Sequence, residues 1–251
     1  MHKTGQKVTA CIVVIGNEIL SGRTQDLNIA YIGKRCDELG IRLMECRVIA
    51  DVEAVIMGTV DACRRSYDYV FTTGGIGPTH DDITTAAIAR LFQKPVERNA
   101  QAVRVMRTYY GPENLTEARL KMADIPRDAV LIDNPVSGAP GFQLENVFVL
   151  PGVPLIMQAM FEGITDRLTG GEPMLTGSVV TGLAESVFAA DLGKLQNRFP
   201  EVSIGSYPFF RKGKLGVNIV LRTTNAGLLA EATTAVSAMI RDLDGDIIKP
   251  A

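Results

Sequence analysis

One stretch of the chain combines a strand signal, a glycine-rich turn and a helix signal. Residues 69–71 read YVF, a β-branched and aromatic run that predicts a buried strand, and Thr72 and Thr73 lead from it into the turn. Residues 74–78 then read GGIGP, and apolar residues at helical spacing begin at Ile83. Glycine allows left-handed backbone angles and carries no side chain, so a ligand can approach the peptide amides directly. A strand, a glycine turn and a helix N-terminus in this order predict an anion-binding site.

Two carboxylates, Asp81 and Asp82, stand between this turn and the expected helix. They would repel a bare phosphate, so their position favours a divalent cation held between carboxylate and phosphate. The alternative is that they only cap the helix, because Thr79 and Asp82 fit a T-x-x-D capping box. The glycine pattern matches neither the dinucleotide fingerprint nor the P-loop, so this motif alone does not name the ligand.

The first part of the chain alternates strand and helix patterns. The expected strands are residues 8–15, 41–49 and 69–72. Three strand–turn–helix units in succession predict an α/β fold with a doubly wound, mostly parallel sheet. Right-handed crossovers would bring Glu18, Asp51 and the pair Asp81–Asp82 to one edge of that sheet, at the carboxyl ends of the strands. Asp51 could equally cap a helix expected over residues 52–65.

The pattern changes after residue 168. A strand around Val179, a helix over 185–197, two strands over 202–207 and 215–222 and a helix over 226–243 follow one another. This β-α-β-β-α order predicts a small α+β domain of ferredoxin-like type. We therefore expect a doubly wound α/β domain over residues 1–168 and a second, smaller domain over residues 169–251.

Composition and charge exclude several classes of function. Apolar residues make up 46% of the chain and charged residues 22%, as in ordinary globular proteins. The net charge of −2 gives no electrostatic footprint for nucleic acid or an anionic membrane. No apolar run approaches the roughly 20 residues that span a bilayer, and the first seven residues lack a signal-peptide core. We expect a cytoplasmic protein without a nucleic-acid or membrane partner.

Cysteine and histidine chemistry is sparse. The four cysteines are Cys11, Cys36, Cys46 and Cys63. None forms a C-x-x-C pair and all fall in apolar patterns, so we expect buried free thiols and no zinc site. Only His2 and His80 are available, and no G-x-S-x-G motif accompanies them, which disfavours a serine hydrolase.

Three motifs in order resemble the molybdopterin-binding family of molybdenum-cofactor biosynthesis, which includes MogA and MoaB, and most closely the N-terminal part of CinA-type proteins. They are residues 16–23 (GNEILSGR), residues 72–78 (TTGGIGP) with Asp82, and residues 150–154 (LPGVP). The resemblance implies a MogA-like fold. It also implies that Asp82 and Asp51 carry catalysis and hold a metal ion, with Glu18 as a further ligand.

The same resemblance implies a substrate site built from these loops. The expected substrate-binding residues are Thr73, Gly74, Gly75, Gly77, Pro78, Gly16, Ser21, Arg23, Pro151 and Gly152. For Arg23 a solvated side chain is an equal alternative to a phosphate contact.

Two functions remain open, with a third behind them. CinA-type relatives and the related domain of FAD synthase are associated with divalent-metal-dependent hydrolysis of nucleotide diphosphates, which predicts a pyrophosphatase for ADP-ribose or FAD. Its hard-oxygen site would suit Mg²⁺, Mn²⁺ or Co²⁺. The alternative is a non-hydrolytic protein that binds molybdopterin as a ligand. The third is a regulatory subunit that has kept the fold and lost the chemistry. Relatives of this fold are oligomers, so we expect a homo-oligomer.

Overall fold

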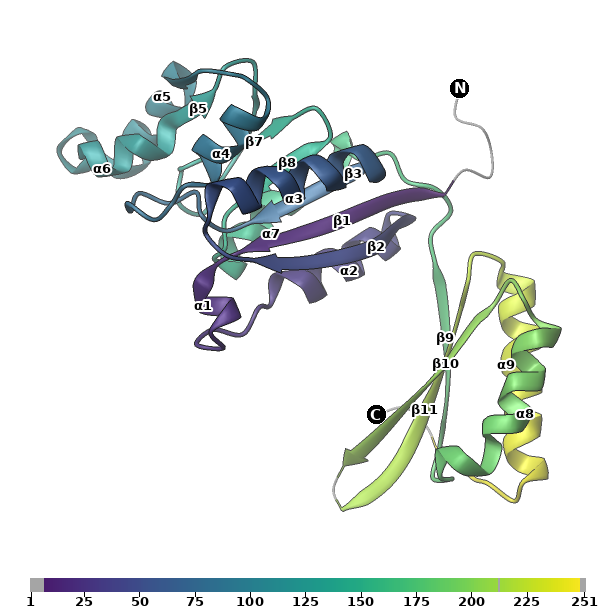
Figure 1. The fold of residues 1–251 in the computed structure, drawn as a ribbon. Helices are drawn as coiled ribbons and strands as arrows, with labels where there is room; N and C mark the ends of the chain where they lie inside the picture. The colour runs from purple at the N-terminus through teal and green to yellow at the C-terminus, as the bar shows by residue number, and fades with distance from the viewer. Residues whose placement is uncertain (1–6, 212, 249–251) are drawn as a thin grey trace. The chain divides into compact units, whose positions relative to one another are not determined.

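A computed structural model describes residues 7–211 and 213–248 of the chain (Figure 1). The chain divides into two compact units, Met1–Gly171 and Glu172–Ala251. The sequence expectations for residues 1–6, including His2, lie outside the described residues. No helix in the described ranges is long and apolar enough to cross a membrane.

The large unit is built on a six-stranded sheet in the order β2-β1-β3-β8-β7-β6. Its strands are β1 (Val8–Ile15), β2 (Ile41–Ile49), β3 (Tyr69–Thr73), β6 (Val130–Ile132), β7 (Gly141–Leu144) and β8 (Val147–Leu150). Strands β2, β1, β3 and β8 pair in parallel, β7 pairs antiparallel with β8, and β6 pairs antiparallel with β7. Because β2 and β3 lie on opposite sides of β1, the strand order reverses there. Ligands bind at such switch points, outside the carboxyl ends of the strands.

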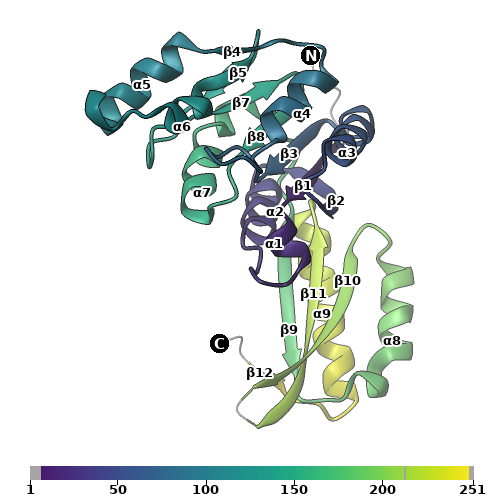
Figure 2. The same cartoon turned by 60° about the vertical axis from the view of Figure 1, so that its left-hand side comes forward.

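Helices cover both faces of this sheet, as the two views show (Figures 1 and 2). The helices are α2 (Asn28–Glu38), α3 (Glu53–Ser66), α4 (Thr84–Leu91) and α7 (Pro154–Glu162). Helices α2 and α7 pack on one face against alternate residues of β1, among them Ile12. Helices α3 and α4 pack on the other face, where Val13 lies. Burial on both sides explains why β1 is apolar without interruption.

Apart from helix α5, the remaining elements of the large unit are short. They are α1 (Asn17–Leu20), β4 (Val96–Arg98), α5 (Ala100–Tyr110), α6 (Glu117–Leu120) and β5 (Asp124–Pro126). Three of them depart from the sequence expectations: α1 replaces an expected loop, and β4 pairs with β5 in a small separate sheet. Strands of three residues carry too little periodicity to be recognised. Helix α7 ends at Glu162, and a 3₁₀ turn (Thr165–Arg167) follows.

The small unit has the predicted ferredoxin-like topology. Its elements are β9 (Leu175–Thr181), α8 (Glu185–Arg198), β10 (Ser203–Arg211), β11 (Lys214–Thr223), α9 (Ala226–Asp242) and β12 (Ile247–Ile248). The strand order is β10-β11-β9-β12, and every pairing is antiparallel. Phe188, Ile219 and Val236 lie in its core. The predicted fold class, a doubly wound sheet followed by a smaller α+β domain, is confirmed.

One ion pair fastens α2 to α7 across the face of the large sheet. Arg35 donates from Nε and Nη2 to the two carboxylate oxygens of Glu162, at 2.7 and 2.8 Å, and the Tyr31 hydroxyl donates to the same carboxylate. These hydrogen bonds, that of Arg35 first, lower the pKa of Glu162. Burial of the Tyr31 hydroxyl, and after it the hydrogen bond to Glu162, raise the pKa of Tyr31 to about 12. The charged form of Glu162 therefore stabilises the folded chain.

Replacing Glu162 with glutamine is expected to lower the free energy of unfolding at pH 7 by up to about 1 kcal/mol, because the pair is partly exposed. A carboxylate whose folded-state pKa is depressed contributes stability above its unfolded pKa of about 4.3. That contribution disappears as the pH falls through the folded-state pKa. Urea denaturation of both proteins between pH 7 and about pH 3 should show the difference shrinking toward zero. The exposed Glu113, in a 3₁₀ turn (Pro112–Asn114), gives a control variant, Glu113→Gln, that should match the wild type throughout. A difference that persisted at the acidic end would contradict the ion-pair account.

Candidate functional site

The glycine turn, residues 74–78, packs tightly at the carboxyl end of β3. Gly74 and Gly75 have φ of +103° and +68°, angles that favour glycine. A Cβ on Gly74 would lie 2.1 Å from the carbonyl oxygen of Ile15, and one on Gly75 would lie 2.2 Å from Oγ1 of Thr84. The turn therefore fits between the end of β1 and the first residue of α4 only because Gly74 and Gly75 lack side chains.

The loop after β8 closes over the same turn. The Gly74 N–H donates to the Leu150 carbonyl at 3.1 Å. Gly152 follows two residues later and stacks directly on Gly74, where an added Cβ would lie 3.4 Å from the Gly74 Cα. Its carbonyl accepts a hydrogen bond of 2.9 Å from Nδ2 of Asn28, the first residue of α2. The structure thus brings the second and third sequence motifs together.

The loops after β1 and β2 meet beside them. The Gly16 N–H donates to the Ile49 carbonyl at 3.1 Å, and the Asn17 N–H donates to the Asp51 carboxylate at 2.8 Å. Loops from β1, β2, β3 and β8 therefore lie side by side, as the parallel crossovers predicted. We call this region the carboxyl edge.

Unpartnered oxygens are concentrated at the carboxyl edge. Within the described residues, five buried side-chain oxygens lack a hydrogen-bond partner, and four of them lie here. They are Oδ1 of Asn28 and the hydroxyls of Thr72, Thr73 and Thr84, side chains that are at most 2% exposed. A buried polar group left unpaired costs about 1–3 kcal/mol, and native proteins carry few. The four lie on both faces of the sheet where β3 ends, Thr72 on the face of Val13 and Thr73 on that of Val14.

The predicted carboxylates each have a local partner. The Asp82 carboxylate accepts the N–H of Thr79 at 2.8 Å, as well as its hydroxyl, and lies against the Cα of Gly77. The Glu18 carboxylate folds back onto Gly16. Across the described residues, the carboxylates of Glu18, Asp51 and Asp82 do not form a cluster of three within 4.8 Å. They line the edge from separate loops and offer only hard oxygen donors, which fit Mg²⁺ or Mn²⁺ when phosphate oxygens and water complete the shell.

Neither Asp82 nor Asp51 caps the helix that follows it, which was the alternative reading of both residues. The Thr79–Asp82 bond predicted by the capping box is present, but it closes a turn ahead of the helix. Helix α4 begins at Thr84 and its N-cap, Ile83, makes no side-chain cap. Helix α3 is capped by Val52, also without a side-chain bond, while Asp51 reaches across to the loop after β1.

The other predicted substrate-binding residues are more exposed. The Arg23 guanidinium donates to the Ser21 hydroxyl at 3.2 Å, and that hydroxyl donates to the Glu18 carbonyl at 3.2 Å. In the described part of the chain, neither side chain bonds to the glycine turn. Pro78 is exposed, and Pro151 is half-buried.

Sequence reasoning missed three residues that the structure places at this edge. They are Asn28, Thr84 and Lys121. The Lys121 ammonium donates to the carbonyls of Thr79 and Asp82. It therefore sets a positive charge beside the glycine turn. A threonine at the start of a helix that follows a glycine turn was the available signal for Thr84. Lys121 is distant in sequence and gave none.

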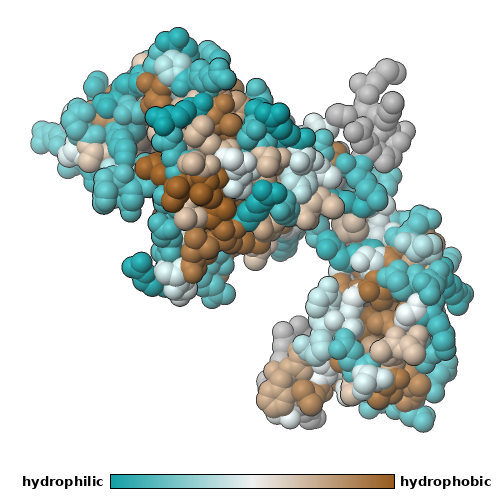
Figure 3. All heavy atoms as spheres, viewed as in Figure 1, coloured by the Kyte–Doolittle hydropathy of each residue, from teal (hydrophilic) through white to brown (hydrophobic). Residues whose placement is uncertain are grey.

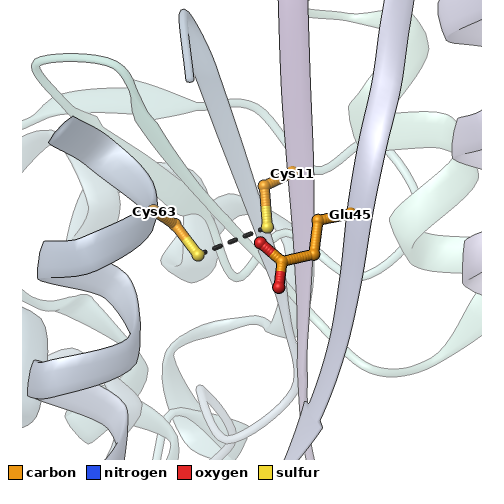
Figure 4. Close-up of side chains that lie close together, drawn as sticks. All are labelled: Cys11, Glu45 and Cys63. Carbon is orange, nitrogen blue, oxygen red and sulfur yellow. Dashed lines mark hydrogen bonds between the residues drawn. The ribbon is translucent and has the colours of Figure 1, made fainter. Parts of the chain in front are cut away.

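The cysteines depart from expectation in two ways. Cys11, Cys36 and Cys63 are buried as expected, but Cys46 is exposed. The sulfurs of Cys11 and Cys63 are 3.3 Å apart, and the Glu45 carboxylate lies beside them (Figure 4). The hydrogen bond between the two thiols, together with burial, raises the pKa of Cys11. Sequence spacing could not reveal this group because its members come from three separate elements.

A family profile described as "Probable molybdopterin binding domain" matches residues 11–170, which include the whole carboxyl edge. The chain belongs to this family. A second profile, "FAD synthase, middle domain", matches residues 173–244 of this molybdopterin-binding-domain protein. The resemblance seen in the sequence motifs is therefore confirmed.

Named relatives agree with both assignments. A protein called "Probable FAD synthase" from Caenorhabditis briggsae is 33% identical over 95% of this chain and 50% of its own length. A "CinA-like protein" from Salinibacter ruber is 30% identical over 95% of this chain and 60% of its own. The chain spans about half the length of the nematode relative. A solved structure of CinA from Thermoplasma acidophilum is 33% identical, covers 64% of this chain and 98% of that one, and superposes with a TM-score of 0.61.

Proposed function

We propose that this protein is a divalent-metal-dependent nucleotide pyrophosphatase that acts on diphosphates such as ADP-ribose or FAD. The observation that carries the proposal is the set of four unpartnered buried oxygens around the glycine turn. Phosphate oxygens, bridging water and a metal ion can satisfy such groups. The likeness to an FAD synthase domain supports a substrate of this class.

Each part of the carboxyl edge has a role in this proposal. The Gly74 N–H already donates to the Leu150 carbonyl, so the Gly75 backbone is where a phosphate can approach the peptide, and Lys121 adds a fixed positive charge beside it. Asp82 and Asp51, with Glu18, would hold a hard divalent cation. Such an ion, when bound, lowers the pKa of a bound water and screens charge on the diphosphate. The oxygen of a water adds to one phosphorus, the bridging P–O bond breaks, and the products are AMP and the second phosphate monoester.

The surface beside the carboxyl edge is apolar and suits the binding of a planar ring. A hydrophobic patch reaches the surface where β1 and β2 end and α3 begins (Figure 3). Val52 and Val55, at the start of α3, are 49% and 41% exposed. Ligand sites commonly combine apolar walls with a few polar groups, and here apolar side chains follow directly on Asp51. An adenine, flavin or pterin could rest there.

The test is release of AMP by the purified chain. ADP-ribose and FAD are each incubated with protein and Mg²⁺, Mn²⁺ or Co²⁺, and the products are separated by chromatography. AMP should appear in at least one metal and should vanish with excess chelator. No release in any of the three metals would reject the proposed activity.

Non-hydrolytic binding of molybdopterin is the second candidate, and the name of the matching family favours it. The same glycine turn would hold the pterin's terminal phosphate. Calorimetry that gave a dissociation constant in the micromolar range or below, from a protein that releases no AMP, would favour binding alone.

Replacing Thr84 with valine is expected to have opposite effects on stability and on binding. Removing an unpartnered buried hydroxyl should raise the unfolding free energy of the free protein by about 1 kcal/mol. The same change should weaken nucleotide binding several-fold, because a ligand partner is lost. Urea denaturation and calorimetry measure the two effects.

The small unit offers a matched control for this change. Thr181 is also fully buried at a strand end, but its hydroxyl accepts the Leu183 N–H at 3.2 Å. Thr181→Val should therefore lose about 1 kcal/mol of stability and leave binding unchanged. An equal loss of stability in Thr84→Val would mean that its hydroxyl does not await a ligand.

The cellular location and the oligomeric state of the protein stay predictions. A cytoplasmic nucleotide hydrolase fits the reduced cysteines. The expected homo-oligomer can be checked by light scattering of the purified chain.

A further inference from the structure

A second cluster of possible ligand groups lies away from the carboxyl edge, between the sheet and α3. Within the described residues, Cys11 of β1, Glu45 of β2 and Cys63 of α3 form the one group of three whose ligand atoms lie within 4.8 Å of one another (Figure 4). Both thiols are fully buried, whereas the Glu45 side chain, on the edge strand, is 33% exposed. The group is thus enclosed on the inside and reachable from the sheet edge.

A β-bulge between β1 and β2 places the Glu45 side chain on the same face of the sheet as the two thiols. Between β1 and β2 the register passes from Ala10 beside Leu43 to Cys11 beside Glu45, so that Met44 is left over as a β-bulge. In an unbroken register Cys11 would stand beside Met44, and Glu45 would point to the opposite face. Bulges often re-aim a side chain next to a functional site.

Neighbouring groups hold the carboxylate in place. Arg47 donates from Nε and Nη2 to its two oxygens at 2.8 and 3.0 Å, and the Tyr67 hydroxyl donates at 2.8 Å. Metal-binding carboxylates commonly have such outer partners. Two thiolates and one carboxylate carry three negative charges, and a divalent cation with the Arg47 guanidinium balances them. A divalent ion would therefore leave the site neutral, which a buried position favours.

We propose that Cys11, Cys63 and Glu45 bind a thiophilic divalent cation of the Zn²⁺ type, with water in the fourth position. Sulfurs bound tetrahedrally to zinc at 2.3 Å stand about 3.8 Å apart, so the pair at 3.3 Å needs to open by roughly half an ångström. A disulfide, at about 2.05 Å, would need a closing movement more than twice as large. Binding releases two thiol protons to solvent and forms two metal–sulfur bonds, with no change of oxidation state.

Cobalt(II) is the probe that tests this site, because thiolate-to-cobalt charge transfer absorbs in the near ultraviolet and oxygen-only sites give no such band. Reduced, chelator-treated protein is titrated anaerobically with Co²⁺ and then with Zn²⁺. We expect the band to saturate at one equivalent and to disappear when Zn²⁺ displaces cobalt. Absence of the band in reduced wild-type protein would overturn the proposal, and so would conversion of the pair to a disulfide by mild oxidant without any cobalt binding.

Single-residue variants show which side chains give rise to the cobalt charge-transfer band. Cys63→Ser should abolish it, and Glu45→Gln should weaken cobalt binding by about 10–100-fold. Cys46→Ser, which changes the exposed cysteine, should retain it. Asp82→Asn should also retain it, so this result is independent of the proposed hydrolysis. Circular dichroism checks that each variant folds. If Cys63→Ser does not fold, Glu45→Gln decides, and an unchanged affinity there would contradict the assignment.

Discussion

Replacing Asp82 with asparagine is expected to reduce AMP release by at least about 100-fold, since even the loss of an outer partner of a metal ligand commonly costs 10–100-fold. The asparagine oxygen can still accept the Thr79 N–H, so the turn that precedes α4 should keep its shape. The change removes one negative charge and little else. The measurement is the initial rate of AMP formation at saturating Mn²⁺ or Mg²⁺, with circular dichroism to show that the variant is folded.

A matched aspartate separates this effect from a general loss of charge. Asp128 pairs with Lys94 at 2.7 Å beyond the last turn of α4, whereas Asp82 precedes the first. Its φ of +67° is one that asparagine readily adopts. Asp128→Asn should therefore keep the wild-type rate. Undiminished release from Asp82→Asn, or an equal loss in both variants, would remove Asp82 from the catalytic site.

Replacing Gly74 with alanine is expected to lower the free energy of unfolding by about 3–5 kcal/mol. The backbone angle is strained for any residue with a side chain, and the added Cβ would lie 2.1 Å from the Ile15 carbonyl oxygen. The Ile15 carbonyl belongs to the backbone at the end of β1, so it cannot move away without disturbing that strand. Nucleotide binding should be lost as well, because the turn and the ends of β1 and β8 would separate.

Gly22 provides the comparison for this variant. It also has a positive φ, +70°, but no atom lies within 4 Å of the position that a Cβ would take. Gly22→Ala should therefore cost only the backbone strain, about 1–2 kcal/mol. Urea denaturation of both variants separates strain from steric exclusion. Equal costs would show that the close approach at Gly74 is unimportant.

Much of the fold could be predicted because its elements carry strong local patterns. The apolar run over residues 8–15 predicted β1. The apolar run before the glycine turn at 74–78 predicted β3 and the loop that follows it. The alternation over residues 215–222 marked the central strand β11 of the small unit. In each case the pattern reflects burial of one or both strand faces, which depends little on distant parts of the chain.

Side-chain partners were harder to predict because they depend on contacts between distant segments. Asp51 and the Asn17 N–H are brought together only when β1 and β2 pair. The Cys11–Glu45–Cys63 cluster depends on a one-residue bulge, and a register shift of that kind leaves no mark in a single sequence. Asn28 joins α2 to the loop after β8 through a hydrogen bond to the Gly152 carbonyl. For such groups the sequence predicts at which edge of the sheet they lie, but not which partners they contact.

Crystals soaked with Mn²⁺ and a methylene analogue of ADP-ribose, which cannot be hydrolysed at the bridging position, test most directly whether the carboxyl edge holds a diphosphate. The predicted result is phosphate density within hydrogen-bond distance of the Gly75 and Gly77 backbone N–H groups. An anomalous manganese peak should lie between that density and the carboxylates of Asp82 and Asp51. Density bound elsewhere on the protein, with an empty glycine turn at saturating ligand, would contradict the account.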